Sequence, residues 1–224
     1  MIAAIHQPNY IPWRGYFSKI MRCDVFIFLD DVQYTKNGFI NRNRIKTSNS
    51  VNWMTIPVEL TRGLHTKIRE VVVRGDQWRE QHLKTLEVNY KKTGFFDEIY
   101  PLFYNVVADK NIRNLSELNK KLIIEISNYL GLKCKFMSQS NFKCSHHKSM
   151  LLIELLEKAN CDTYIYGHGA QNYQDNNLFK ENGITTIKCE YNIKEYPQLW
   201  KEYQENLSII DLLFNCGKKS IEYL

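Results

Sequence analysis

The sequence predicts an α/β fold, with a mostly parallel Rossmann-like sheet flanked by helices and a helical middle section. Three observations support this prediction. Short apolar runs typical of buried strands alternate with amphipathic stretches, and a helical segment separates the first two runs. Of the 224 residues, 44% are hydrophobic and 24% are charged, which is the balance of a folded chain. This length is enough to bury a sizeable core, and we expect one domain over residues 1–224.

The N-terminal part of the chain has the pattern of a parallel strand–helix–strand unit. Residues 1–5 and 25–29 are short apolar runs of the kind found in buried strands. Residues 12–22 carry apolar side chains at helical spacing, and Pro12 suits the first turn of a helix. Because such a unit has a right-handed crossover, both strands should end at the same edge of the sheet.

The remaining elements are predicted in order along the chain. Strands are expected at residues 51–60, 67–74, 134–137, 163–166 and 184–189, and helices at residues 77–90, 95–107, 115–130, 149–159 and 208–214. Gly131 suits the C-terminal cap of one helix, and Ser149 the N-terminal cap of another. The concentration of helix between about residues 76 and 130 predicts an insertion or lid.

Charge and cysteine content narrow the class of protein. The formal net charge of +6 is compatible with a phosphate-bearing or nucleotide-bearing partner. Part of this excess is local, with basic residues at Lys36, Arg42, Arg44, Lys46 and Arg62. The six cysteines lack C-x-x-C and zinc-type spacings, so we expect buried thiols in a reduced compartment and no metal site. Without a signal peptide or an apolar run long enough to span a membrane, the protein is expected to be cytoplasmic.

Polar side chains follow three of the predicted strands. Open α/β sheets bind ligands outside the carboxyl ends of their strands, so these segments predict a small-molecule site. They are His6, Gln7, Asn9 and Tyr10 after the first strand, Asp30 and Asp31 after the second, and residues 167–173, including Gly167 and Tyr173, after a later one. The last segment resembles a phosphate-binding loop only loosely, because it lacks the G-x-G-x-x-G pattern and the P-loop lysine.

His6 is the candidate catalytic base, because an imidazole changes its charge near neutral pH. Asp30 and Asp31 cannot both face the same way on a strand, and one of them is expected to face the site. That carboxylate would orient His6, hold a metal through water or act as a base itself. The structural alternatives are a histidine that is hydrogen-bonded to a turn and an aspartate that caps the following turn.

A second group of candidate substrate-binding residues is Asn41, Arg42, Asn43 and Arg44. Guanidinium forks bind phosphate or carboxylate in bidentate fashion, so a nucleotide diphosphate is a natural partner. The alternative is a solvated basic stretch.

Several blocks of the sequence resemble the WbqC-like protein family. They are residues 6–17, 24–34, 41–46, 53–58 and 208–215, together with Tyr191. The likeness spans nearly the whole chain, although residues 167–169 fit less closely. It implies a bacterial protein of O-antigen (lipopolysaccharide) or other surface polysaccharide biosynthesis. The implied activity is an acyl- or aminoacyl-transferase, for example a glycyltransferase, that modifies the amino group of a nucleotide-linked amino sugar.

The resemblance leads to a hypothesis for the mechanism. His6 would deprotonate the sugar amine, and Asp30 or Asp31 would orient the imidazole. The developing oxyanion would accept a hydrogen bond from Asn9, Asn41 or Asn43, and Arg42 and Arg44 would hold the diphosphate. The donor would be acyl-coenzyme A or aminoacyl-tRNA, and the sequence identifies no cofactor. Two alternatives stay open: a glycosyltransferase with a nucleotide-sugar donor, and a non-catalytic protein that binds nucleotide-sugars or RNA.

Overall fold

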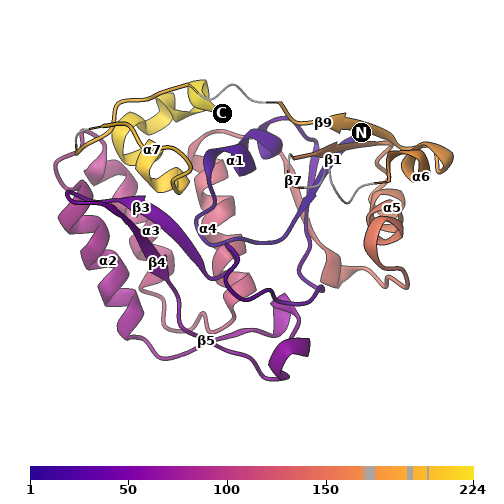
Figure 1. Ribbon diagram of the computed structural model, residues 1–224, viewed down its shortest axis with the longest axis horizontal. Helices are drawn as coiled ribbons and strands as arrows, with labels where there is room; N and C mark the ends of the chain where they lie inside the picture. The colour runs from indigo at the N-terminus through magenta and orange to yellow at the C-terminus, as the bar shows by residue number, and fades with distance from the viewer. Residues whose placement is uncertain (168, 170–174, 191–193, 201) are drawn as a thin grey trace.

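A computed structural model describes residues 1–167, 169, 175–190, 194–200 and 202–224, and within these residues a five-stranded parallel sheet forms the centre of the molecule (Figure 1). The strand order is β7-β2-β1-β8-β9. The strands are β1 (Ile2–His6), β2 (Val25–Phe28), β7 (Lys135–Ser138), β8 (Thr163–Tyr166) and β9 (Thr185–Lys188). The α/β fold with a parallel, Rossmann-like sheet is therefore confirmed.

The order of the strands identifies where a ligand is expected. The chain adds β2 and then β7 on one side of β1, and later adds β8 and β9 on its other side. β1 pairs with β2 with His6 opposite Phe28, and with β8 with Ala4 opposite Ile165. The strand order therefore reverses between β1 and β8, and open α/β sheets bind ligands at such a switch point.

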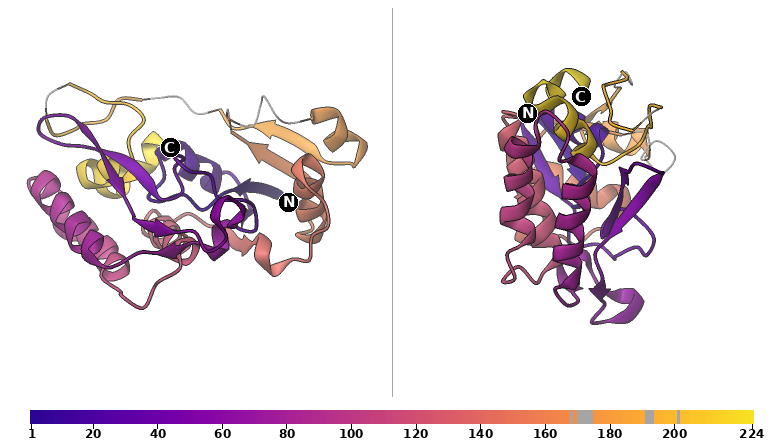
Figure 2. Two further views of the ribbon diagram at one scale, coloured as in Figure 1. Left: turned by 60° about the horizontal axis from the view of Figure 1, so that its bottom comes forward. Right: turned by 90° about the vertical axis from the view of Figure 1, so that its left-hand side faces the viewer.

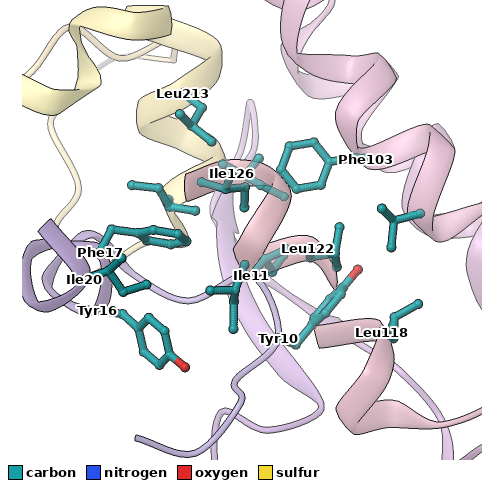
Figure 3. Close-up of a cluster of buried hydrophobic side chains, with 14 of the residues drawn as sticks. Tyr10, Ile11, Tyr16, Phe17, Ile20, Phe103, Leu118, Leu122, Ile126 and Leu213 are labelled. Carbon is teal, nitrogen blue, oxygen red and sulfur yellow. The ribbon is translucent and has the colours of Figure 1, made fainter. Parts of the chain in front are cut away.

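The two faces of the sheet belong to two hydrophobic cores, because successive side chains of a strand point to opposite faces. Ala4 and Phe26 face the larger core, which α1 (Arg14–Met21), α4 (Leu115–Tyr129) and α7 (Ile209–Cys216) complete. Figure 3 shows the centre of this core, with Phe17 of α1, Ile126 of α4 and Leu213 of α7.

The smaller core lies on the opposite face of the sheet. Ala3 and Ile27 pack there against Leu155 of α5 (Lys148–Lys158) and Phe179 of α6 (Asn176–Glu181). Both faces of the central strands are therefore covered, which explains why these strands read as continuous apolar runs.

The helical middle section consists of α2 (Gln77–Tyr90), α3 (Phe96–Val107) and α4. Leu86, Phe103 and Leu122 of these helices belong to the same core as Phe26 of the sheet. Tyr90 of α2 stacks on Phe214 of α7, with ring centroids 4.8 Å apart. The sequence predicted helices at these positions. That they form an insertion or lid within a single domain stays a prediction.

Two antiparallel pairs lie outside the main sheet. β3 (Arg42–Lys46) and β4 (Val51–Thr55) form a hairpin in which Arg44 faces Trp53 across the strands. β5 (Val58–Glu59) pairs with β6 (Val72–Val73).

Some boundaries differ from the sequence-based prediction. The strand expected at residues 51–60 is interrupted before β5, where Pro57 has no N–H to donate to a strand ladder. The strand expected at residues 67–74 contains a 3-10 helix (Ile68–Glu70) and only the short β6. Ser149 was wrongly predicted as a cap, because α5 begins one residue earlier with His147 at the N-cap position. The strand β3 and the helix α6 were not predicted, since β3 is mostly polar and α6 is short.

No helix among the described residues combines the length and apolar character needed to cross a membrane. All six cysteines are free thiols, and four of them are buried.

Candidate functional site

A hollow of about 780 Å³ lies beside the carboxyl ends of β1 and β8, at the point where the strand order reverses. Its size falls within the range of pockets for small organic ligands. The lining comes from β1, from the segment after β2, from the first turns of α5 and from β8, and comprises Ile5, His6, Gln7, Leu29, Val32, Lys148, Ser149, Leu151, Leu152, Tyr164 and Gly169. The predicted segments after β1 and β8 thus contribute to one site.

His6 ends β1 and lines the hollow with a half-buried imidazole. Its Nδ1 lies 3.1 Å from the carbonyl oxygen of Gln7, and its ring packs edge-on against Tyr16 at 4.8 Å between centroids. Burial, assisted by the positive charge of Lys19, lowers the pKa of His6 to about 3. The ring is therefore neutral at pH 7. Because a carbonyl oxygen only accepts, Nδ1 carries the proton and Nε2 is the basic nitrogen.

The ammonium group of Lys19 is a positive charge close enough to His6 to affect its pKa. Its side chain on α1 is only 6% exposed, and its Nζ lies 5.6 Å from the centre of the Tyr16 ring. Burial lowers the pKa of Lys19 to about 8, so the amine is mostly charged at neutral pH. Among the described residues no carboxylate pairs with it, and the residues outside the described part include no Asp or Glu. An ammonium buried without a counterion favours an anionic ligand nearby.

The start of α5 is a second source of positive potential at the hollow. Lys148 and Ser149 form its first turn and line the hollow. The side chain of the N-cap residue, His147, accepts no hydrogen bond from the first turn. The N-terminal end of a helix carries a partial positive charge, and unsatisfied N–H groups there bind anions. The apolar lining and these charges together suit a ligand with an apolar part and an anionic part.

The two aspartates after β2 do not accompany His6. Asp30 is 1% exposed, and its carboxylate accepts hydrogen bonds from the Ser140 backbone N–H at 2.9 Å and from the Ser140 hydroxyl at 2.8 Å. It also pairs with Lys120 of α4. No described contact joins it to the His6 ring, so Asp30 connects the end of β2 to α4 and to the segment after β7.

Asp31 points to a different part of the chain. Its carboxylate pairs with Lys67 at 2.8 Å and with Arg69. Burial acts to raise the pKa of Asp31, but the hydrogen bonds from Lys67 and Arg69 outweigh burial and hold that pKa below its usual value. Within the described contacts, Asp31 therefore stabilises the segment before β6 rather than the His6 imidazole.

The candidates at residues 41–44 lie on the hairpin and do not line the hollow. The amide of Asn41 donates to the Ile56 carbonyl at 2.8 Å, and that of Asn43 to the Ile11 carbonyl at 2.8 Å. Both amides are thereby committed to backbone groups, whereas Arg42 and Arg44 lie beside Trp53.

The remaining candidates after β1 and β8 are divided between site and core. Gln7 lines the hollow, and Gly167 lies close to the Lys19 ammonium. Tyr10 is buried, and its hydroxyl is 2.9 Å from Nδ1 of His82. Asn9 is also buried, and Tyr173 lies outside the described residues.

Sequence reasoning missed Lys19, Lys148, Ser149 and Tyr164 as parts of the site or its surroundings. The signal for Lys19 was its position three residues after Tyr16, on the apolar face of the predicted helix. A lysine on such a face is rarely buried without a reason. Within the described residues, no cluster of three or more His, Cys, Asp or Glu side chains could hold a metal ion.

Comparisons with known proteins cover nearly the whole chain. The model of the WbqC-like protein family matches residues 7–223. The uncharacterized protein Rv1507c of Mycobacterium tuberculosis is 39% identical over 222 residues, which cover 99% of this chain and 96% of that protein. No solved structure matches the chain.

Proposed function

Given that the chain belongs to the WbqC-like protein family, we propose that it transfers an acyl or aminoacyl group, such as glycyl, to the amino group of a nucleotide-linked amino sugar. The product would serve bacterial surface polysaccharide synthesis, such as that of O-antigen. The observation that carries the proposal is that His6 lines a hollow of about 780 Å³ at the switch point of the sheet, with Nδ1 held by the backbone carbonyl of Gln7 so that Nε2 is the basic nitrogen.

The reaction needs a base at the attacking nitrogen. The sugar amine attacks the carbonyl carbon of the thioester or ester donor, a C–N bond forms, and the C–S or C–O bond to the carrier breaks. His6 Nε2 accepts the proton that the nitrogen loses and returns it to the departing thiolate or ribose oxygen. Gln7 takes over the positioning role first expected of Asp30 or Asp31, because its carbonyl oxygen holds Nδ1–H.

Binding of the substrate would raise the pKa of His6 and so make Nε2 a stronger base. A base with a pKa near 3 is neutral at pH 7 but a weak proton acceptor. Burial is the main cause of the low pKa of His6, and a diphosphate near Lys19 and the start of α5 would counter the second cause, the positive charge of Lys19. Binding of the nucleotide-linked sugar would therefore raise that pKa toward neutrality.

Product mass tests the proposed reaction. Purified protein is incubated with a panel of nucleotide-linked amino sugars and with either acyl-coenzyme A or aminoacyl-tRNA, and the sugar product is analysed by mass spectrometry. The proposal predicts a sugar heavier by one acyl or aminoacyl unit. A gain of one hexose would instead identify a glycosyltransferase and contradict the proposal.

Substitution of His6 tests the base. The variant His6→Ala should lower the transfer rate at least ~10²-fold, because general-base catalysis contributes that much or more. His146→Ala is the matched control, since His146 is exposed and pairs with Glu154 at 3.0 Å. An unchanged rate in His6→Ala would refute the assignment of the base.

A further inference from the structure

The outer face of the β3–β4 hairpin carries two aromatic rings and two guanidinium groups, those of Phe39, Trp53, Arg42 and Arg44. These four residues form the hairpin platform. Figure 1 and the left view of Figure 2 place the hairpin on the other side of the molecule from β9 and α6. None of the four residues lines the hollow beside His6.

The strand register brings the platform together. Arg44 lies directly opposite Trp53, and Arg42 lies two residues before Arg44, so both arginines share the outer face with Trp53. The Arg42 Cζ is 4.3 Å from the centre of the Trp53 ring, and the Arg44 Cζ is 5.8 Å from it. The Phe39 ring is 5.8 Å from Trp53 between centroids. Phe39 is 45% exposed and Trp53 46%, so both rings stand open to solvent.

The positive charge of the platform is uncompensated. Arg42 donates a hydrogen bond to the Asn37 carbonyl at 2.6 Å, and Arg44 donates one to the Asn206 carbonyl at 3.0 Å. These bonds orient the guanidinium groups without neutralising them. Residues 32–58 include no Asp or Glu, and no described carboxylate forms an ion pair with either arginine. A ligand with negative charge is therefore favoured at this face.

We infer that the hairpin platform binds single-stranded nucleic acid. Exposed aromatic rings stack on bases irrespective of sequence, while arginines beside them contact the phosphates. A free nucleotide would require a concave site that encloses it, whereas each ring here is nearly half exposed. A polymer suits an open surface, because each nucleotide adds a modest contribution along the strand.

A protein partner fits the platform less well. Protein interfaces are enriched in aromatic residues and arginine, but the buried centre of such an interface is apolar and has few charged residues overall. Among the described residues, the exposed large aliphatic side chains lie on other segments, at Leu64, Val88, Ile187 and Ile221. On the platform, two guanidinium groups that form no ion pair with a described carboxylate flank Trp53.

Fluorescence anisotropy with a labelled oligouridylate tests the inference at low salt. Trp53→Ala should weaken binding about 10-fold or more, because one base–aromatic stack is lost. Trp53→Phe keeps a ring and should bind within about 3-fold of the wild type. Tyr104→Ala is the matched control, since Tyr104 is a 50% exposed aromatic residue on α3. Unchanged thermal unfolding of each variant shows that the fold is retained.

Salt dependence tests the charges. Arg44→Gln should reduce the slope of log affinity against log salt concentration by about 0.7, the value for one phosphate contact in a single strand. Lys110→Gln removes one exposed positive charge elsewhere and should leave the slope unchanged. Equal slopes in the wild type and Arg44→Gln would contradict the inference.

Three further results would overturn it. They are the absence of oligonucleotide binding by the wild-type protein at low salt, wild-type affinity in Trp53→Ala, and equal affinity for uridine monophosphate and the oligonucleotide. The inference does not rest on the proposed transfer reaction. His6→Ala is therefore expected to keep wild-type affinity for the oligonucleotide, whichever reaction the hollow performs.

Discussion

The hollow beside His6 and the hairpin platform are both positively charged, but they differ in burial. Lys19, which lies near His6 but does not line the hollow, is 6% exposed, and burial lowers the pKa values of both His6 and Lys19. On the platform, the rings are nearly half exposed, and the described hydrogen bonds of the guanidinium groups go to backbone carbonyls. Burial thus tunes protonation states for chemistry, whereas exposure leaves charge and aromatic surface free for recognition.

The two regions also differ in how far they depend on distant contacts. The four residues of the platform come from one hairpin and the loop before it, and the hydrogen bond from Arg44 to the Asn206 carbonyl is a contact with a distant part of the chain. The hollow brings β1 together with the start of α5 and with β8, which both lie more than a hundred residues later in the chain. Substitutions near the hollow should therefore affect stability, while those on the platform should affect binding alone.

The largest effect is expected for Asp30→Ala, next to the hollow. Removal of this buried carboxylate leaves Lys120 without its partner, and the free energy of unfolding should fall by about 3–5 kcal/mol. Asp31→Ala is the control, because its ion pairs are partly exposed and should contribute less than about 1 kcal/mol. Urea unfolding measures both changes. A loss as small as that of Asp31→Ala would show that Asp30 is not a structural residue.

Lys19→Met should change the free energy of unfolding by less than Asp30→Ala does, and should increase it rather than lower it. Each unit of pKa depression corresponds to about 1.4 kcal/mol, so removal of this buried charge should raise the free energy of unfolding by about 1–3 kcal/mol at pH 7. The same variant should bind a nucleoside diphosphate about 10-fold more weakly, because it loses a charged partner. Loss of stability, or unchanged nucleotide affinity, would argue against an anion site at Lys19.

The pH dependence of the stability difference between Lys19→Met and the wild type tests whether the lysine charge causes that difference. The folded-state pKa of Lys19, about 8, lies below the usual value of 10.5. Between these values the unfolded chain holds more protons, so Lys19 makes the wild type more stable as the pH rises. The advantage of Lys19→Met should therefore shrink between about pH 8 and 10. A constant difference across this range would mean that the lysine charge does not cause it.

The smallest effect on stability is expected for Trp53→Ala on the platform. Exposed substitutions away from special backbone positions usually change the free energy of unfolding by no more than about 0.5 kcal/mol. Urea unfolding should therefore leave the midpoint nearly unchanged, while oligonucleotide binding falls. A loss above about 2 kcal/mol would indicate that Trp53 serves the fold rather than recognition.

Much of the fold followed from local patterns in the sequence. The first strand–helix–strand unit and helix α2 show their periodicity over many residues, so their positions were predicted closely. The hairpin strand β3 was missed because its alternation involves Asn43, a buried polar residue whose role depends on the Ile11 carbonyl. Local pattern does not reveal a partner that is distant in the sequence.

The edge of the sheet at which the hollow lies could be predicted from the sequence, whereas the contacts of the candidate residues could not. Polar residues after β1 and β8 pointed to this edge, because open α/β sheets bind ligands outside the carboxyl ends of their strands. The partner of Asp30, Lys120, lies 90 residues further along the chain, and no local signal connects them. The same holds for Lys19, whose effect on His6 depends on how α1 packs against β1.

The central claim is that His6 serves the hollow as a neutral base whose pKa responds to an anionic ligand. A nuclear magnetic resonance titration of the imidazole tests it most directly, and the signal that is missing from the spectrum of His6→Ala identifies His6. We predict an Nδ1-protonated neutral ring in the free protein that titrates near pH 3, with a pKa that rises when a nucleotide-linked amino sugar binds. Titration near pH 6.5 in both the free and the bound protein would contradict the account.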